Sequence, residues 1–371
     1  MHVSSSFDSG NIEVLDASDP GAVRLQIRKD AGGDHLQWFH FRAAAKAGDE
    51  VAFRIENAHA CSYPEAWKGY QAAASVDRET WYRVPTSFDG KVLLIQDTLA
   101  ADVVHYAYFA PYSQERHLDL VAASVAAGAR LEVLGQTLDG ADLDALHLGE
   151  GPLQLWLIAR QHPGESMAEW WMEGFLGRLL DPDDALARRL LSLATFHVVP
   201  NMNPDGSRRG HLRNNAAGAN LNREWHAPDI ARSPEVRLVR DRMDSTGVDL
   251  CLDVHGDEEL PYNFVSGAEG IAGWTDRMAG LQDRFCVALE RANPDFQRVY
   301  GYPVDPPGEA NMSMCTNQIA QRFDCLAMTL EQPFKDTADT PQPSQGWSPG
   351  RAMALGASCL DALTAVVPDL R

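Results

Sequence analysis

The segment His162-Pro-Gly-Glu165 places an imidazole and a carboxylate three residues apart, on either side of a Pro-Gly turn. A turn this tight allows both side chains to face one ion. Zinc favours nitrogen and carboxylate oxygen donors in a tetrahedral arrangement, and a catalytic zinc site keeps one position open for water. The segment therefore predicts two ligands of a catalytic metal site that requires a third.

His255 is the candidate for this third ligand. It follows the apolar run 248–254, and alternation along that run places His255 on the face opposite the most apolar side chains. A single histidine at a strand end is more often structural than a ligand, and the pattern H-x-x-E is common by chance, so neither signal suffices alone. His197, His211 and His226 do not combine a strand end with a carboxylate at ligand spacing.

Polar groups follow four apolar runs that we expect to be strands. The runs are 153–159, 195–199, 248–254 and 325–330, and the groups that follow them are His162, residues 203–206, His255 and Glu331. In open α/β sheets, ligands bind outside the carboxyl ends of the strands. Packing alone does not explain a polar group at each of these ends, so we expect one shared site.

The pattern of the chain changes near residue 113. Before it, short apolar or alternating runs are broken by Gly, Pro, Asp and Asn, which is typical of an antiparallel β-sandwich. Ser113 is expected to cap a helix, and apolar strands then alternate with amphipathic segments, including expected helices at 166–180, 271–292 and 349–366. We therefore predict an all-β domain at 1–112 and an α/β domain at 113–371.

Composition narrows the classes of partner. The 371 residues carry a formal net charge of −20, which disfavours binding to a phosphate backbone, so nucleic acid is not an expected partner. No window approaches the roughly 18 unbroken apolar residues of a membrane helix, and the first residues lack a signal-peptide pattern. The six cysteines are scattered without a C-x-x-C pair. We expect a cytoplasmic protein that does not bind membranes, and no pattern indicates an oligomeric state.

Five motifs together carry a family resemblance. They are H-P-G-E at 162–165, N-P-D-G at 203–206, N-L-N-R at 220–223, D-V-H-G at 253–256 and T-L-E-Q-P-F at 329–334. In this order they resemble the M14 zinc metallocarboxypeptidases, and most closely the cytosolic carboxypeptidase-like subfamily of bacterial type. The resemblance implies a β-sandwich domain followed by a mixed, twisted sheet flanked by helices, with the site at the strand ends.

The resemblance implies a role for each matching residue. His162, Glu165 and His255 would bind one Zn²⁺ per chain, and Asn222 and Arg223 would hold the terminal carboxylate of a peptide or protein substrate. Glu331 would be the general base and acid, and Arg213 would polarise the scissile carbonyl.

Chemistry supports these roles independently. A metal-bound water needs a carboxylate to take its proton and deliver it to the leaving amine, as Glu331 could do. The developing oxyanion needs a fixed positive donor, which Arg213 supplies, and the planar guanidinium of Arg223 suits a carboxylate. The alternative is that these arginines form a solvated basic surface.

The chain also departs from the family pattern. Many members have an aspartate beside the first zinc histidine where this chain has Asn220, which adds no negative charge. The pancreatic-type enzymes have a tyrosine roughly twenty residues before the catalytic glutamate, and residues 308–330 contain none. Tyr300 and Tyr302 lie further upstream, and the sequence assigns neither to the site.

Substrate preference is the least determined feature. The resembled subfamily includes enzymes that remove C-terminal glutamates, and Arg322 and Gln318 could line the pocket for that residue. Aromatic residues of the first domain could form a binding face, although such residues are more often sandwich core. One alternative function is a zinc amidase or deacylase acting on a small acylated amino acid. Another is a non-catalytic binding module, which the complete set of ligands, base and electrophile disfavours.

Overall fold

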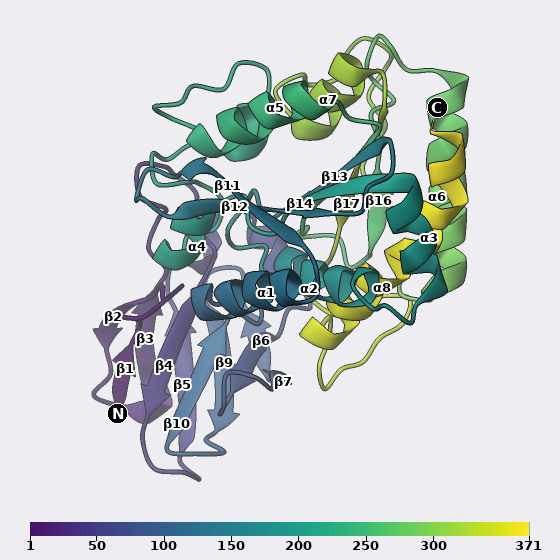
Figure 1. The fold of residues 1–371 in the computed structure, drawn as a ribbon. Helices are drawn as coiled ribbons and strands as arrows, with labels where there is room; N and C mark the ends of the chain where they lie inside the picture. Colours follow the sequence, from purple (N-terminus) through teal and green to yellow (C-terminus); the bar gives the residue numbers. More distant parts are fainter. Residues whose placement is uncertain (371) are drawn as a thin grey trace.

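The computed structural model describes residues 1–370 and begins with two five-stranded sheets, in the orders β1-β4-β10-β6-β7 and β2-β3-β5-β9-β8 (Figure 1). All pairings are antiparallel except that β3 runs parallel to β5. The strands are β1 (His2–Ser4), β2 (Glu13–Asp16), β3 (Val23–Gln26), β4 (His40–Ala44), β5 (Glu50–Ile55), β6 (Ala72–Ser75), β7 (Tyr82–Val84), β8 (Thr86–Phe88), β9 (Leu93–Thr98) and β10 (Val103–Ala107). The expected all-β sandwich is confirmed, with one parallel pair.

Aromatic side chains fill the space between these two sheets. Phe41 of β4 and Phe53 of β5 belong to different sheets, and their ring centroids lie 5.1 Å apart in an edge-on arrangement. Among the aromatic residues that could have formed a binding face, Tyr82 is half-buried and the other five are buried, namely Trp38, Trp67, Trp81, Tyr106 and Tyr108. These five therefore stabilise the sandwich core and do not form a binding surface.

A seven-stranded mixed sheet follows, in the order β11-β12-β14-β13-β15-β17-β16. Its central strands β14, β13, β15 and β17 run parallel, while β11, β12 and β16 pair antiparallel at the two edges. The strands are β11 (Arg130–Gln136), β12 (Asp142–Leu148), β13 (Leu153–Ala159), β14 (Ala194–Val199), β15 (Leu250–Val254), β16 (Phe264–Ser266) and β17 (Leu326–Glu331).

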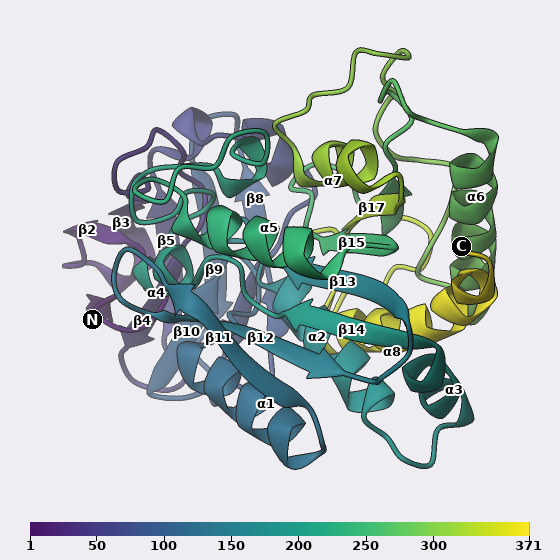
Figure 2. The same ribbon diagram turned by 45° about the horizontal axis from the view of Figure 1, so that its top comes forward.

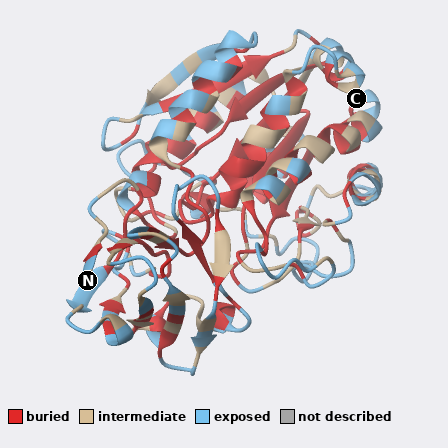
Figure 3. Ribbon diagram, turned by 90° about the horizontal axis from the view of Figure 1, so that it is seen from below, coloured by how far each residue is buried: buried red, intermediate tan, exposed pale blue. Residues whose placement is uncertain are grey.

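Helices cover both faces of the mixed sheet, with α5 and α7 on one side and α1, α2 and α8 on the other (Figure 2). Trp156 and Ile158 of β13 pack in the core with α5 and α7, whereas Leu155 and Leu157 pack in the core with α2 and α8. The central strands are therefore buried along their length (Figure 3). The helices are α1 (Gln114–Ala126), α2 (Met167–Leu179), α3 (Ala185–Leu193), α4 (Pro204–Arg209), α5 (Pro234–Thr246), α6 (Asp276–Ala292), α7 (Cys315–Phe323) and α8 (Pro349–Val366).

Glycines allow α2 and α8 to approach closely. A Cβ atom at Gly356 would lie 2.1 Å from the carbonyl oxygen of Trp171, and one at Gly174 would lie 2.0 Å from that of Met353. By length and composition, Pro349–Asp369 could also span a membrane, but half of its most apolar window is buried. The core helix of a soluble protein has the same properties, and the packing of α8 on α2 fits such a helix.

Candidate active site

The parallel strands bring the ends of distant segments together. β13 and β15 pair in register up to Ala159 and Val254, so the residues that follow them start side by side. The backbone N–H of His255 donates to the carbonyl of Leu330 at 2.8 Å, which places His255 next to the end of β17. The segments that carry His162, His255 and Glu331 thus leave the sheet at the same edge.

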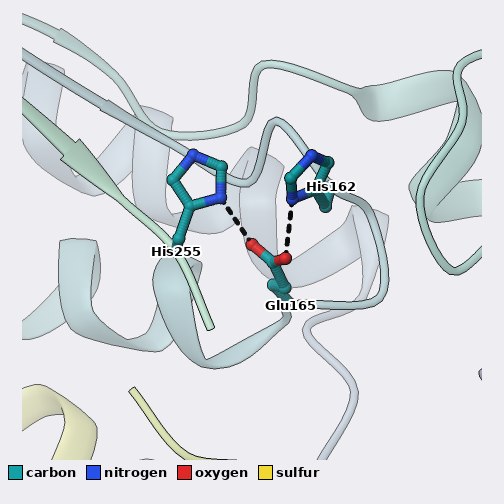
Figure 4. A group of neighbouring side chains, drawn as sticks. All are labelled: His162, Glu165 and His255. Carbon is teal, nitrogen blue, oxygen red and sulfur yellow. Dashed lines mark hydrogen bonds and ion pairs between the residues drawn. The ribbon is translucent and has the colours of Figure 1, made fainter. Parts of the chain in front are cut away.

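His162, Glu165 and His255 converge on one point (Figure 4). Glu165 lies between the two histidines, with Oε1 2.7 Å from Nδ1 of His162 and Oε2 2.8 Å from Nδ1 of His255. One potential ligand atom from each residue lies within 4.8 Å of the others, and all three residues are buried. The structure therefore places together the three residues expected to hold a metal.

Further hydrogen bonds orient both imidazoles. Nε2 of His162 lies 3.0 Å from Oδ1 of Asn220, and Nε2 of His255 lies 3.0 Å from Oδ2 of Asp253. An acceptor beside each Nε2 favours a hydrogen on that nitrogen, so that with a cation between the three side chains each Nδ1 would present its lone pair to the cation. Two lone pairs and a carboxylate facing one another are the donors that a divalent cation requires.

The electrostatics of the three residues also fit a cation. Burial and the nearby Arg213 lower the pKa of His162 to about 3, so its imidazole is neutral. Burial alone would lower the pKa of His255, but Asp253 and Glu165 raise it well above its ordinary value. Burial alone would raise the pKa of Glu165, but the two histidines lower it. The environment therefore favours positive charge between ionised Glu165 and the imidazoles.

Glu331 ends β17 and is only 6% exposed. Its Oε2 is buried and has no hydrogen-bond partner among residues 1–370. Burial raises the pKa of Glu331 to about 8, and Glu165 adds to this effect while His255 opposes it. A carboxyl group with such a pKa can both accept and donate a proton near neutral pH.

Two arginines, Arg213 and Arg223, lie near one another. Within the described chain, neither Arg213 nor Arg223 forms an ion pair with a carboxylate, and burial together with Arg213 lowers the pKa of Arg223. Asn222 lies beside them, and its Oδ1 accepts from the backbone N–H of Cys315 at 2.8 Å. Its amide N–H groups are therefore turned to donate elsewhere. Two guanidinium groups that form no ion pair within residues 1–370, together with an amide donor, suit the binding of an anion.

Sequence reasoning missed several side chains near Arg213. The ring of Tyr63, from the β-sandwich, lies 5.7 Å from the Arg213 guanidinium. Glu258 is buried, and burial raises its pKa well above the ordinary value although Arg213 opposes this shift. Glu258 directly follows the D-V-H-G motif and an additional Asp257, which was a usable signal. Tyr63 lies about a hundred residues from the nearest motif, so no local pattern marked it.

A hollow of about 220 Å³ lies next to the end of β17. Tyr302 lines it together with Thr329, and the Tyr302 hydroxyl donates to Oδ2 of Asp257 at 2.6 Å. The structure thus brings Tyr302 to this region, while Tyr300 stacks on Tyr262 with ring centroids 4.5 Å apart.

Arg322, which was expected to line the pocket for the C-terminal residue, pairs with another helix and does not line this hollow. Its guanidinium forms two hydrogen bonds with Asp244 of α5, at 2.6 and 2.7 Å. Neither Arg322 nor Gln318 is among the residues that line the hollow. The cation at the C-terminal end of α7 is therefore engaged by Asp244 of α5.

Comparison with known proteins decides the family. Residues 3–109 match the cytosolic carboxypeptidase N-terminal domain, and residues 114–267 match the zinc carboxypeptidase family. A metallo-carboxypeptidase from Pseudomonas aeruginosa, solved in complex with (2-guanidinoethylmercapto)succinic acid, is 47% identical over the full length of both chains, with a TM-score of 0.97. This chain is an M14 metallocarboxypeptidase of the cytosolic carboxypeptidase type.

Two further relatives support this family assignment. A metallo-carboxypeptidase structure from Burkholderia cenocepacia is 45% identical over 99% of both chains, with a TM-score of 0.97. Cytosolic carboxypeptidase 6 of Caenorhabditis elegans is 23% identical and aligns over 92% of this chain and 80% of its own length. The M14 chain is therefore a peptidase hydrolase, and the expected family and fold class are confirmed.

Proposed function

We propose that this metallocarboxypeptidase uses one Zn²⁺ per chain to hydrolyse the C-terminal peptide bond of peptides or proteins. The observation that supports it most is the convergence of His162, Glu165 and His255, each oriented so that its donor atom faces the same point. When bound, zinc lowers the pKa of a water molecule and polarises a carbonyl group.

The protein groups around this point would carry out the proton and charge transfers. Glu331 removes a proton from water and delivers it to the leaving amine, for which its pKa of about 8 is well placed. Arg213 stabilises the negative charge that develops on the carbonyl oxygen, because a guanidinium stays protonated at any working pH. Arg223 and the amide of Asn222 bind the terminal carboxylate, which restricts cleavage to the last residue.

The proposal also takes the hollow beside β17 as the pocket for the side chain of the released residue. Glu269 and Asp305 line it, and no lysine, arginine or histidine among residues 1–370 does. A C-terminal glutamate in this hollow would meet two carboxylates, so the glutamate preference implied by the resemblance has no cation to support it there. We therefore expect neutral and basic residues to be released faster than glutamate.

We further propose that the two domains divide between residues 112 and 113 and that the protein acts in the cytoplasm. The side chain of Ser113 accepts from the backbone N–H of Arg116 and so caps α1, the first helix after the sandwich strands. The two family matches fall on either side of this point. The location rests on the naming of relatives as cytosolic carboxypeptidases.

The proposal is tested with peptides that differ only in the C-terminal residue, each as free acid and as amide. We expect release of one residue at a time from the free acids and little from the amides, and Glu331→Gln should lower kcat about 10²- to 10⁴-fold while zinc content persists. Glu309→Gln, which changes an exposed carboxyl, is the matched control. Faster hydrolysis of acylated amino acids than of peptides would favour the amidase alternative, and unchanged activity in Glu331→Gln would exclude the assigned base.

A further inference from the structure

The loop that carries Arg213 is held by the β-sandwich. Asp30 lies between β3 and β4 and is 2% exposed. Its Oδ1 accepts from the backbone N–H of Leu212 at 2.7 Å, and its Oδ2 accepts from those of Arg213 and Asn214 at 2.8 and 2.9 Å. One carboxylate thus binds three consecutive N–H groups of the other domain.

Neighbouring contacts fix the same loop. The backbone N–H of Ala31 donates to Nε2 of His211 at 3.0 Å, and Nδ2 of Asn11 donates to the carbonyl of Gly210 at 2.8 Å. Both Ala31 and Asn11 belong to the sandwich, so residues 210–214 contact the first domain along their whole length. Among these contacts only Asp30 bonds the N–H of Arg213 itself.

The partners of Asp30 point to a specific role. Each hydrogen bond made by its side chain goes to residues 212–214, and none goes to its own domain. Charge-assisted bonds to a buried carboxylate are short and directional, so they fix the backbone conformation at these residues. Contacts from the sandwich therefore fix the backbone of Arg213, from which its side chain extends. The ring of Tyr63, in the same domain, lies beside the guanidinium.

We propose that Asp30 is a positioning residue that holds Arg213 in its reactive place, so that the two domains share one active site. The proposal rests on the role of Arg213 in charge stabilisation given above. Because Arg213 would act in the transition state, loss of its placement should lower kcat more than it raises KM.

A double-mutant cycle in the full-length, zinc-loaded enzyme tests the proposal. Asp30→Asn puts an amide N–H against backbone N–H groups, and we expect kcat to fall about 10- to 100-fold with KM changed less than about threefold. In the Arg213→Ala background the same change should lower kcat less than about twofold, because no side chain is left to misplace. Asp34→Asn is the control, since the Asp34 side chain is 99% exposed.

Three results would overturn the proposal. The first is a wild-type kcat in Asp30→Asn. The second is a double variant in which Asp30→Asn lowers kcat by the same factor as it does alone, which would mean that Asp30 supports the fold in general. The third is a wild-type kcat in Arg213→Ala, which would exclude the role of Arg213 and with it the role of Asp30. The proposed carboxypeptidase activity is tested separately, by hydrolysis in the wild type. If Asp30→Asn does not fold by circular dichroism, Asp30→Glu, which keeps the charge but moves it, replaces it in the same cycle and is judged by the same criteria.

Discussion

Glu165 and Glu331 are both buried carboxyl groups at the same edge of the sheet, yet their environments separate their pKa values. Two imidazoles lower the pKa of Glu165, whereas the unpartnered Glu331 has its pKa raised to about 8. Groups whose environments push their pKa values apart can divide the roles of permanent charge and proton carrier. Glu165 therefore suits a metal ligand, and Glu331 suits a base.

Substitutions of Asn220 test whether its hydrogen bond with His162 affects zinc affinity. Its Oδ1 accepts from His162, and aspartate at this position would add the negative charge common in the family. We expect Asn220→Asp to bind zinc about tenfold more tightly and Asn220→Ala to bind it at least about tenfold more weakly, because outer partners set the basicity of a ligand. Competition with a chromogenic chelator measures both affinities. Equal affinities in all three proteins would show that Asn220 does not act through His162.

The sequence could predict the residues that lie in local motifs, and the structure places His162, Glu165 and His255 together as expected. It could not predict Asp30 or Tyr63. These side chains approach Arg213 only after the sandwich docks on the second domain, and no spacing along the chain encodes that contact. The pairing of Arg322 with Asp244 could not be predicted either, because the two residues meet only when α7 and α5 pack together.

At the scale of elements, apolar runs predicted the strands that are buried on both faces. Residues 153–159 form β13 and residues 349–366 form α8, both with the expected bounds. The edge strand β11 was not expected, since it is largely exposed and becomes a strand only by pairing with β12. The helix α5 was not expected either, because its sequence is mostly polar and only a narrow apolar stripe is buried.

A buried network links α1, α2 and the turn that carries His162. His117 of α1 lies 2.6 Å from Oε1 of Glu169, whose Oε2 accepts from Arg160 at 2.6 Å. Arg160 in turn donates to the carbonyl of Pro163 at 3.0 Å and has a left-handed φ of 59°. This network therefore contacts the turn that carries His162 and includes one residue, Arg160, in an uncommon backbone conformation.

The charge of His117 makes this network sensitive to pH. Burial opposes the charge, but Glu169 and Asp144 raise the pKa of His117 to about 9. The protonated histidine therefore stabilises the fold fully below pH 6.5, and this contribution is lost as pH rises through about 9. The free energy of unfolding of the wild type minus that of His117→Gln should therefore decrease by up to about 3 kcal/mol as pH rises between these limits.

Urea denaturation at several pH values measures this difference. His59→Gln, at an exposed histidine, should show no such dependence and is the control. A constant difference between wild type and His117→Gln from pH 6 to pH 10 would contradict the assigned charge.

At the scale of the whole molecule, Arg83 joins the two domains. It donates to the carbonyl of Gln71 in the sandwich and to those of Phe334, Gln345 and Trp347 in the second domain. Arg83→Met keeps the aliphatic stem but leaves these carbonyls without a donor. We expect the free energy of unfolding to fall by about 2–4 kcal/mol, measured by chemical denaturation.

Arg54→Met provides the comparison for this change. The Arg54 side chain makes a surface ion pair with Glu56 at 3.5 Å, and its loss should change the free energy of unfolding by less than about 1 kcal/mol. An equal effect of the two substitutions would mean that Arg83 does not hold the domains together.

Zinc content of the purified protein tests the central claim most directly. With Zn²⁺ supplied and excess removed, the wild type and His226→Ala, a change at an exposed histidine, should each retain about one zinc per chain, and His255→Ala should retain less than about a tenth of that. Retention of a full equivalent of zinc by His255→Ala, or its absence from the wild type, would contradict a metal held by His162, Glu165 and His255.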